Sequence, residues 1–163
     1  MRTLSIKASR IMNEIFKDRD LETNPHRKYD NGGEGIMALV TEVIMPIGYG
    51  DDSRDEIELV SVAHYYEQNG DLMKDPEMVF KRVRDPLYND QSLFFPISFQ
   101  QDNLGLLNES VRFTPDEKSS RWNTSYRRAM QRDQAVFASE WLVNANDQQG
   151  LGFDVKKEDD SDG

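Results

Sequence analysis

The chain has 163 residues, 37% hydrophobic and 31% charged, with a formal net charge of −10. This length is typical of one domain and allows a buried core without covalent staples. The lack of cysteine excludes a disulfide framework, a thiolate zinc site and a cysteine nucleophile. The acidic balance argues against a free duplex-DNA binder, because such proteins gain most of their affinity by neutralising phosphates.

The N-terminal residues contain no apolar run of signal-peptide length, and no stretch approaches the length of a membrane span. We therefore expect a cytoplasmic protein with no membrane partner. A single α+β domain is predicted over residues 1–150. An acidic, disordered tail is predicted over residues 151–163, because that segment is polar and charged. No cofactor is predicted.

An amphipathic helix is predicted at residues 4–16, with Thr3 as its N-cap. Its apolar positions recur with helical spacing: Leu4, Ala8, Ile11, Met12 and Ile15. The next residues, 17–34, contain Asn-Pro and Asn-Gly-Gly turn signals and are predicted to form a loop.

Four or five strands are predicted next, because β-branched and aromatic residues alternate between turn signals. They cover residues 35–47, 57–66, 77–83 and 92–100, with 104–113 as a fifth strand or a strand-like lead. Asn69-Gly70 predicts a tight hairpin turn. The second strand is apolar on both faces and should be central, whereas Pro96 indicates an edge or a bulge.

A last helix is predicted at residues 120–144. Its apolar stripe consists of Trp122, Tyr126, Met130, Phe137 and Trp141. A run of strands between two helices predicts an α+β fold, an antiparallel sheet of four or five strands with the N-terminal and C-terminal helices packed on one face. Alternating βαβ units are absent, which argues against a Rossmann-type nucleotide fold.

No phosphate loop, zinc-protease motif, nucleophile elbow or EF-hand spacing is present. The chain has two histidines, and His26 falls in the polar loop. His64 admits two interpretations: a proton carrier or metal ligand with nearby carboxylates, or a half-buried strand residue with one hydrogen-bond partner. The carboxylates around it, Glu67, Asp71, Asp75 and Asp102, either form a polar site or shape turns.

One segment is basic. Residues 118–132 carry five lysine and arginine side chains and no acid. Arg121, Arg128 and Arg132 are spaced to lie on one helical face. This face would bind nucleic acid or an acidic partner, or pair with the acidic surface of the protein itself.

The run from His64 to Met78, His-Tyr-Tyr-Glu-Gln-Asn-Gly-Asp-Leu-Met-Lys-Asp-Pro-Glu-Met, resembles a signature of an uncharacterised bacterial domain family of phages, plasmids and conjugative elements. A second signature resembles the segment from Phe99 to Gly105. The resemblance implies a mobile-element context without an established activity. It draws attention to six polar residues, His64, Glu67, Asn69, Asp71, Asp75 and Asp102.

Three functions are compatible with these patterns. The leading one is a small acidic accessory protein that binds a host or element-encoded protein with a basic surface, inhibiting a nucleic-acid-handling or defence protein. The second is nucleic-acid association through the arginine helix. The third is a metal-assisted or acid–base enzyme built on the hairpin between His64 and Asp75.

Overall fold

The computed structural model describes residues 1–30, 35–49, 55–85, 91–115 and 122–153. In chain order the elements are α1 (Ile6–Ile15), β1 (His26–Tyr29), β2 (Ala38–Tyr49), β3 (Glu56–Gln68), β4 (Asp71–Arg84), β5 (Leu93–Gln101), η1 (Asp102–Leu104), β6 (Leu106–Glu109), β7 (Val111–Pro115), β8 (Trp122–Tyr126) and α2 (Arg128–Gln148). Arg121 and the predicted turn and tail at 86–90 and 154–163 lie outside the described residues.

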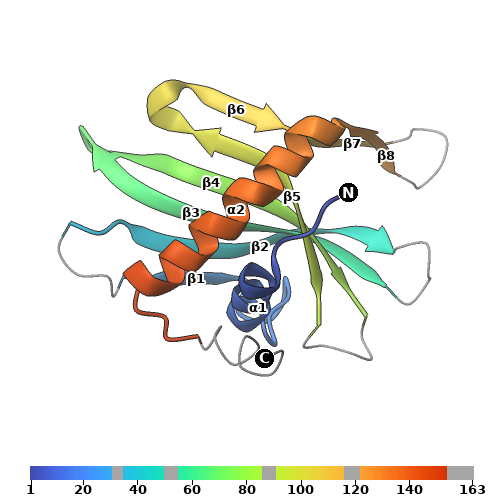
Figure 1. Ribbon diagram of the computed structural model, residues 1–163, viewed down its shortest axis with the longest axis horizontal. Coiled ribbons are helices and arrows are strands. Elements are labelled where there is room, and N and C mark those ends of the chain that lie inside the picture. Colours follow the sequence, from blue (N-terminus) through green and yellow to red (C-terminus); the bar gives the residue numbers. More distant parts are fainter. Residues whose placement is uncertain (31–34, 50–54, 86–90, 116–121, 154–163) are drawn as a thin grey trace, which may run out of the picture.

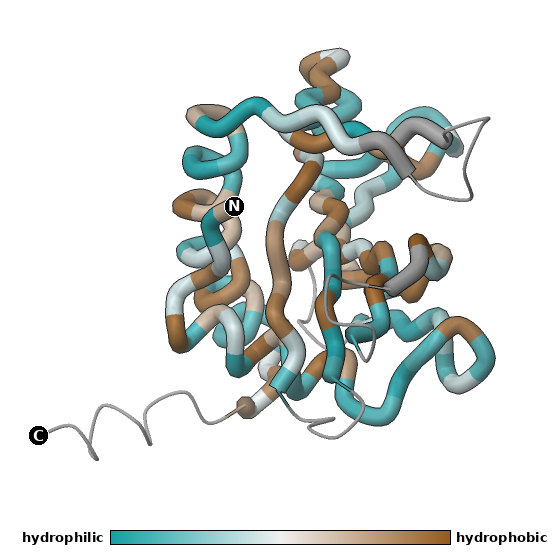
Figure 2. Tube along the Cα trace, turned by 90° about the vertical axis from the view of Figure 1, so that its right-hand side faces the viewer, coloured by the Kyte–Doolittle hydropathy of each residue, from teal (hydrophilic) through white to brown (hydrophobic). Residues whose placement is uncertain are grey.

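The predicted α+β class is confirmed. β1 to β6 form one antiparallel sheet in chain order, β7 and β8 form a separate pair, and α1 and α2 lie across one face of the large sheet (Figure 1). Seen from the side, the helices form one layer and the sheet the other (Figure 2). No described helix is long and apolar enough to cross a bilayer.

The prediction of four or five strands was slightly low, since the large sheet has six. Its extra member is β1, in residues predicted as loop. The sequence of β1, His-Arg-Lys-Tyr, has no apolar alternation, and its first three residues are exposed. β1 is defined by pairing with β2, where Arg27 faces Thr41. The predicted strand at 104–113 is divided between β6 and β7.

The N-terminal helix is confirmed, but its N-cap is Ser5 rather than Thr3. The Ser5 hydroxyl accepts a hydrogen bond from the Ala8 N–H, as an N-cap side chain should. The helix therefore begins at Ile6, two residues later than predicted. The apolar stripe is buried as expected, with Ala8, Ile11 and Met12 in the core.

The core lies between the helices and one face of the sheet. β3 is the third of six strands, so its predicted central position is confirmed. Because successive side chains alternate across a strand, Val60, Val62 and His64 face the helices, whereas Ser61 and Ala63 face away. The core side chains come from both helices and from β2 to β5: Leu4, Ala8, Ile11, Met12, Ile15, Phe16, Leu39, Val43, Val60, Val62, Met78, Phe80, Phe94, Ala138, Trp141 and Leu142.

Two predicted backbone features are present in the sheet. Asn69 and Gly70 both have positive φ, 54° and 85°, as expected of the residues in a tight hairpin turn. The pairing of β4 with β5 shifts register beside Pro96, which lies opposite Phe80 while Ser98 lies opposite Val79. The bulge indicated by Pro96 is therefore present.

The last helix begins later than predicted. Residues 122–126 form β8, which pairs with β7 so that Tyr126 lies opposite Val111, and α2 starts at Arg128. The Trp-Asn-Thr-Ser-Tyr sequence of β8 is rich in residues that favour strands or turns, and a pairing partner is available in β7. The helix then continues to Gln148, four residues beyond the predicted end.

The chain after α2 turns back onto the core. Leu151 and Phe153 are half-buried against it, and the Asn146 side chain bonds both the N–H and the C=O of Phe153. The folded body therefore extends to Phe153, into the first residues of the segment predicted as a tail.

Candidate functional site

The two signature segments meet at one end of the sheet. The Lys74 N–H donates to Asp102 Oδ2 at 2.8 Å, and Gln101 Nε2 donates to Asp75 Oδ1 at 2.8 Å. Asp102 also accepts from Gln100 Nε2 at 3.0 Å. These bonds join the β3–β4 hairpin to the β5–β6 hairpin. Asp75 and Asp102 therefore have a structural role in joining the two hairpins.

This end of the sheet is strongly acidic. Residues 64–77 and 98–109 contain six carboxylates and one lysine, a net charge of −5 out of −10 for the whole chain. Two of these carboxylates are ion-paired, Glu77 with Lys74 and Glu109 with Arg112 just beyond the second segment. Three leucines also protrude: Leu72 and Leu104 are each 67% exposed and Leu107 is 54% exposed. We call these two segments the acidic hairpin end. Exposed apolar patches that are rimmed by polar residues mark contact sites.

The structure brings only some of the predicted polar residues together. Glu67 and Asp71 are exposed on either side of the turn formed by Asn69. Asp75 and Asp102 join the hairpins. His64 points to the other face, beneath α2. Among the described residues, no three His, Asp or Glu side chains are placed to hold a metal ion.

His64 is 5% exposed and packs edge-on against Trp141, with ring centroids 5.5 Å apart. Its Nδ1 accepts a hydrogen bond from Trp141 Nε1 at 3.3 Å, which places the proton of the neutral ring on Nε2. Nε2 is buried and has no hydrogen-bond partner among the described residues. Burial lowers the pKa of His64, and the nearby charge of Asp75 only partly opposes this shift. The geometry is that of a strand histidine with one partner.

We expect His64 to make stability depend on pH. The folded-state pKa lies below the ordinary 6.5, so the unfolded chain takes up a proton first as pH falls. The free energy of unfolding should be unaffected above pH 6.5 and then decrease, by at most about 1.4 kcal/mol per pH unit. Urea unfolding at pH 7.5, 6.5 and 5.5 measures this. His64→Gln should flatten the dependence, and His26→Gln, at an exposed position, should not. Equal slopes in all three proteins would contradict the assignment.

A pocket lies on the sheet face that points away from the helices, near the turn of the β3–β4 hairpin. Its volume is about 470 Å³. The lining residues come from β1 to β4: His26, Lys28, Ala38, Val40, Glu42, Tyr65, Tyr66, Glu67 and Leu72. Of these residues, only Glu67 was predicted from the sequence to belong to a site. Alternation within β3 placed Tyr65 on one face, but the pairing of β1 with β2 had no sequence signal.

Tyr65 is the central polar group of this face. Its hydroxyl lies 3.4 Å from Glu77 Oε2, and Lys74 Nζ lies 3.2 Å from the other oxygen of Glu77. Burial raises the pKa of Tyr65 to about 12, with further contributions from the carboxylates of Glu77 and Glu42. The hydroxyl therefore stays protonated and lies in a negative potential.

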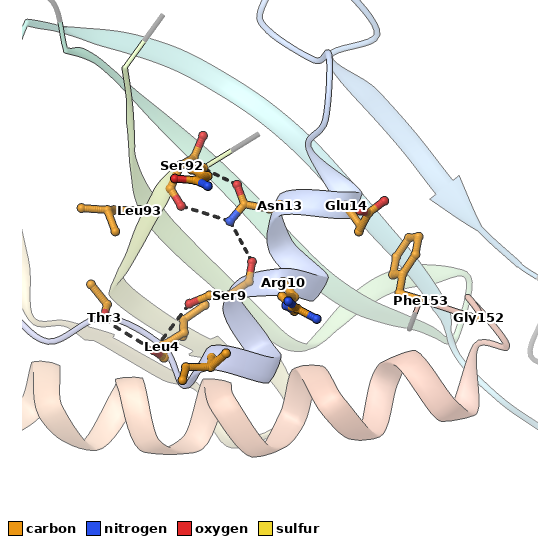
Figure 3. Close-up of a pocket in the computed structure, with 12 residues that line it drawn as sticks. Thr3, Leu4, Ser9, Arg10, Asn13, Glu14, Ser92, Leu93, Gly152 and Phe153 are labelled. Atoms are coloured by element: carbon orange, nitrogen blue, oxygen red, sulfur yellow. Dashed lines mark hydrogen bonds between the residues drawn. The ribbon is translucent and has the colours of Figure 1, made fainter. Parts of the chain in front are cut away.

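A larger groove, of about 840 Å³, lies between α1 and β5. Figure 3 shows Asn13 directed at Ser92 across it. The Asn13 amide accepts from the Ser92 N–H at 2.8 Å and donates to the Ser92 C=O at 3.1 Å, as a neighbouring strand would. Gly152 and Phe153 form its rim. The polar groups of Asn13 and Ser92 are hydrogen-bonded to each other. We therefore interpret this groove as a structural contact between helix and sheet.

The predicted arginine face is only partly described. Arg128 and Arg132 are exposed on α2, and Arg121 lies outside the described residues. Because α2 begins at Arg128, residue 121 precedes the helix by a whole strand. The spacing that placed the three arginines on one helical face therefore does not apply to Arg121.

These features define an α+β protein that carries two helices on one face of an antiparallel sheet, with a pocket and an acidic end on its remaining surfaces. Residues 10–151 match the family model described as a domain of unknown function, DUF6908, and the chain belongs to this family. No curated protein and no solved structure matches the chain significantly.

Proposed function

We propose that the chain is a non-catalytic binding protein that contacts a basic protein surface through the acidic hairpin end. The observation that carries this proposal is the combination of half the net negative charge with three protruding leucines on two joined hairpins. Apolar side chains supply binding energy, and the surrounding carboxylates supply steering and selectivity for a positively charged partner.

The hydrogen bonds between the hairpins support this role. Asp102 and Asp75 hold the two hairpins in one arrangement, so little conformational freedom is lost when a partner binds. The enzyme alternative has less support, since His64 is buried beneath α2, whereas Glu67 and Asp71 are exposed beside the hairpin turn. The nucleic-acid alternative retains two described arginines, Arg128 and Arg132.

The resemblance to a family of phages, plasmids and conjugative elements suggests the setting of this contact. In the cytoplasm of a bacterium, the basic surfaces available to an acidic protein include the grooves of proteins that handle nucleic acid. We propose that a host protein of this kind, such as a defence protein, is bound and inhibited by the acidic hairpin end.

The test is affinity capture from lysate of the bacterium that carries the gene, with nuclease present, followed by mass spectrometry. Glu67→Lys combined with Asp71→Lys changes the charge of the acidic hairpin end by +4 at two exposed positions. We expect this variant to lose a partner that the wild type retains, and we expect capture to weaken between low and high salt.

Asp133→Lys combined with Asp147→Lys is the matched control, because it makes the same charge change at exposed positions of α2. This variant should capture the partner like the wild type. Equal loss in both variants would mean that net charge alone drives binding. Capture that is unchanged by the hairpin substitutions would contradict the proposal.

A further inference from the structure

We infer that the pocket near the turn of the β3–β4 hairpin binds a cationic side chain, an arginine or lysine, of the basic partner. This inference rests on the proposed function, and it names the ligand group and its place. The pocket is next to the acidic hairpin end, and Glu67 and Leu72 belong to both. A segment bound along the exposed leucines would therefore pass its opening.

The pocket has an apolar, half-buried floor and a polar rim. Ala38, Val40 and Tyr65 are half-buried, whereas Lys28 and Glu67 are exposed. Long basic side chains bury their methylene groups on apolar surface and keep the charged group at a polar edge. A volume of about 470 Å³ lies in the range of pockets that hold small ligands, so a whole side chain can enter.

The polar groups of the pocket favour a cation over an anion. Glu42 and Glu67 line it, and the Glu77 carboxylate lies next to the Tyr65 hydroxyl. Burial is the largest cause of the raised pKa of Tyr65, and the carboxylates of Glu77 and Glu42 add to it. A tyrosine ring face attracts a guanidinium or ammonium group, and carboxylates give it charge-assisted hydrogen bonds.

Two basic side chains also line the pocket, and both are at the rim. Lys28 is exposed and lies 3.9 Å from the Asp30 carboxylate. His26 is exposed, with its Nε2 3.6 Å from Glu42 Oε1. Lys74 is paired with Glu77 beside the pocket. The lining residues therefore offer a ligand two carboxylates, Glu42 and Glu67, against a single lysine.

The probe is a capped heptapeptide, Gly-Ser-Arg-Val-Arg-Ser-Gly, compared with the same peptide carrying citrulline in place of both arginines. Citrulline keeps the shape and removes the charge. We expect the citrulline peptide to bind about tenfold more weakly by isothermal titration calorimetry. Methyl NMR should show the arginine peptide shifting Val40. Equal affinity of the two peptides, or shifts confined to residues outside the pocket, would overturn the inference.

Variants distinguish binding in the pocket from binding at the tip of the β3–β4 hairpin. Glu42→Gln and Tyr65→Leu should each weaken binding of the arginine peptide at least about fivefold. Asp71→Asn, at the exposed hairpin tip, should leave it within about twofold. If Tyr65→Leu fails to fold, Glu42→Gln still tests the pocket, because Glu42 is partly exposed. A larger loss in Asp71→Asn than in Glu42→Gln would overturn the inference.

The same variants separate this inference from the proposed function. Capture of the partner by Glu42→Gln as efficiently as by wild type would contradict the pocket and leave the acidic hairpin end as the contact. If the double lysine variant at Glu67 and Asp71 keeps the partner, the proposed function itself fails. The inference is supported when both Glu42→Gln and the double variant lose the partner.

Discussion

Replacing Arg82 with alanine is expected to lower the free energy of unfolding by about 4 kcal/mol, because it removes one member of a buried charge pair and leaves acceptors unpaired. Arg82 is 2% exposed. Its guanidinium donates to the carbonyl oxygens of Phe16 and Arg19, at 3.0 and 2.7 Å, and to Ser92 Oγ at 3.2 Å. These bonds fix the C-terminal end of α1 to β4 and β5.

The charge partner of Arg82 is Glu58, whose Oε1 lies 3.8 Å away and accepts no hydrogen bond from the part of the chain that the structure describes. Burial lowers the pKa of Arg82 to about 10, and the Glu58 carboxylate opposes that shift. Arg82→Ala would leave Glu58 buried with only Arg84 nearby. Arg82→Met combined with Glu58→Leu should therefore recover part of the loss, because no lone buried charge remains.

Urea unfolding at pH 7.5 measures the loss, with Arg84→Ala as the comparison on the same strand. Arg84 pairs with Glu56 and Glu58 near the surface and makes no bond to α1 that the structure describes. We expect Arg84→Ala to cost about 1–2 kcal/mol. Similar losses for the two arginines would contradict a special role for Arg82 at the helix end.

Trp141→Ala is expected to cost about 3–5 kcal/mol, since it empties a large buried volume between α2 and the sheet. Trp141 is 9% exposed and stacks on Phe137 with ring centroids 6.2 Å apart. It also supplies the single hydrogen bond of His64. Without it, both ring nitrogens of His64 would lack a partner inside the protein.

Two comparisons separate packing from hydrogen bonding at this position. Trp141→Phe keeps most of the buried ring and removes the N–H donor, so it should cost about 1–2 kcal/mol. Phe137→Ala removes a ring that is 40% exposed and should cost clearly less than Trp141→Ala. If Phe137→Ala and Trp141→Ala unfold at the same urea concentration, the buried contact with His64 contributes nothing measurable.

Much of the fold could be predicted because the relevant signals are local. The apolar spacing of Ile11 and Ile15 predicts α1, and Asn69-Gly70 predicts the β3–β4 turn, whose geometry needs residues that tolerate positive φ. The two-sided apolar pattern of β3 placed it inside the sheet. Pro96 was correctly associated with a bulge, since proline cannot donate a ladder hydrogen bond.

The remaining fold features depend on partners distant in the chain. β1 is polar and becomes a strand only because β2 offers an edge. The aromatic and small polar residues of β8 are also compatible with the start of a helix. Pairing with β7 makes this segment a strand. The exact start of a helix is weakly specified by local sequence. The prediction therefore placed the N-cap at Thr3, two residues before the observed N-cap, Ser5.

The candidate site was predicted only in part. The run from His64 to Asp75 drew attention to one hairpin. However, successive side chains alternate across a strand, so His64 faces the helices and Tyr65 faces away from them. Adjacent residues therefore lie on different surfaces. Asp75 and Asp102 come together only through the pairing of β4 with β5. Glu42 and Val40 reach the pocket through β2, which no local motif connects to the hairpin.

The strand order of the large sheet has a consequence for the folding pathway. Every strand from β1 to β6 pairs with its neighbour in the chain, so each pairing closes a short loop. The contacts of the N-terminal segment with α2 are different: Arg2 bonds Gln131 and Ser5 bonds Ser139, across 129 and 134 residues. Loop-closure entropy grows with separation, and local pairings form faster. The sheet can thus assemble hairpin by hairpin, and the joining of the two helices is the step with the greatest entropic cost.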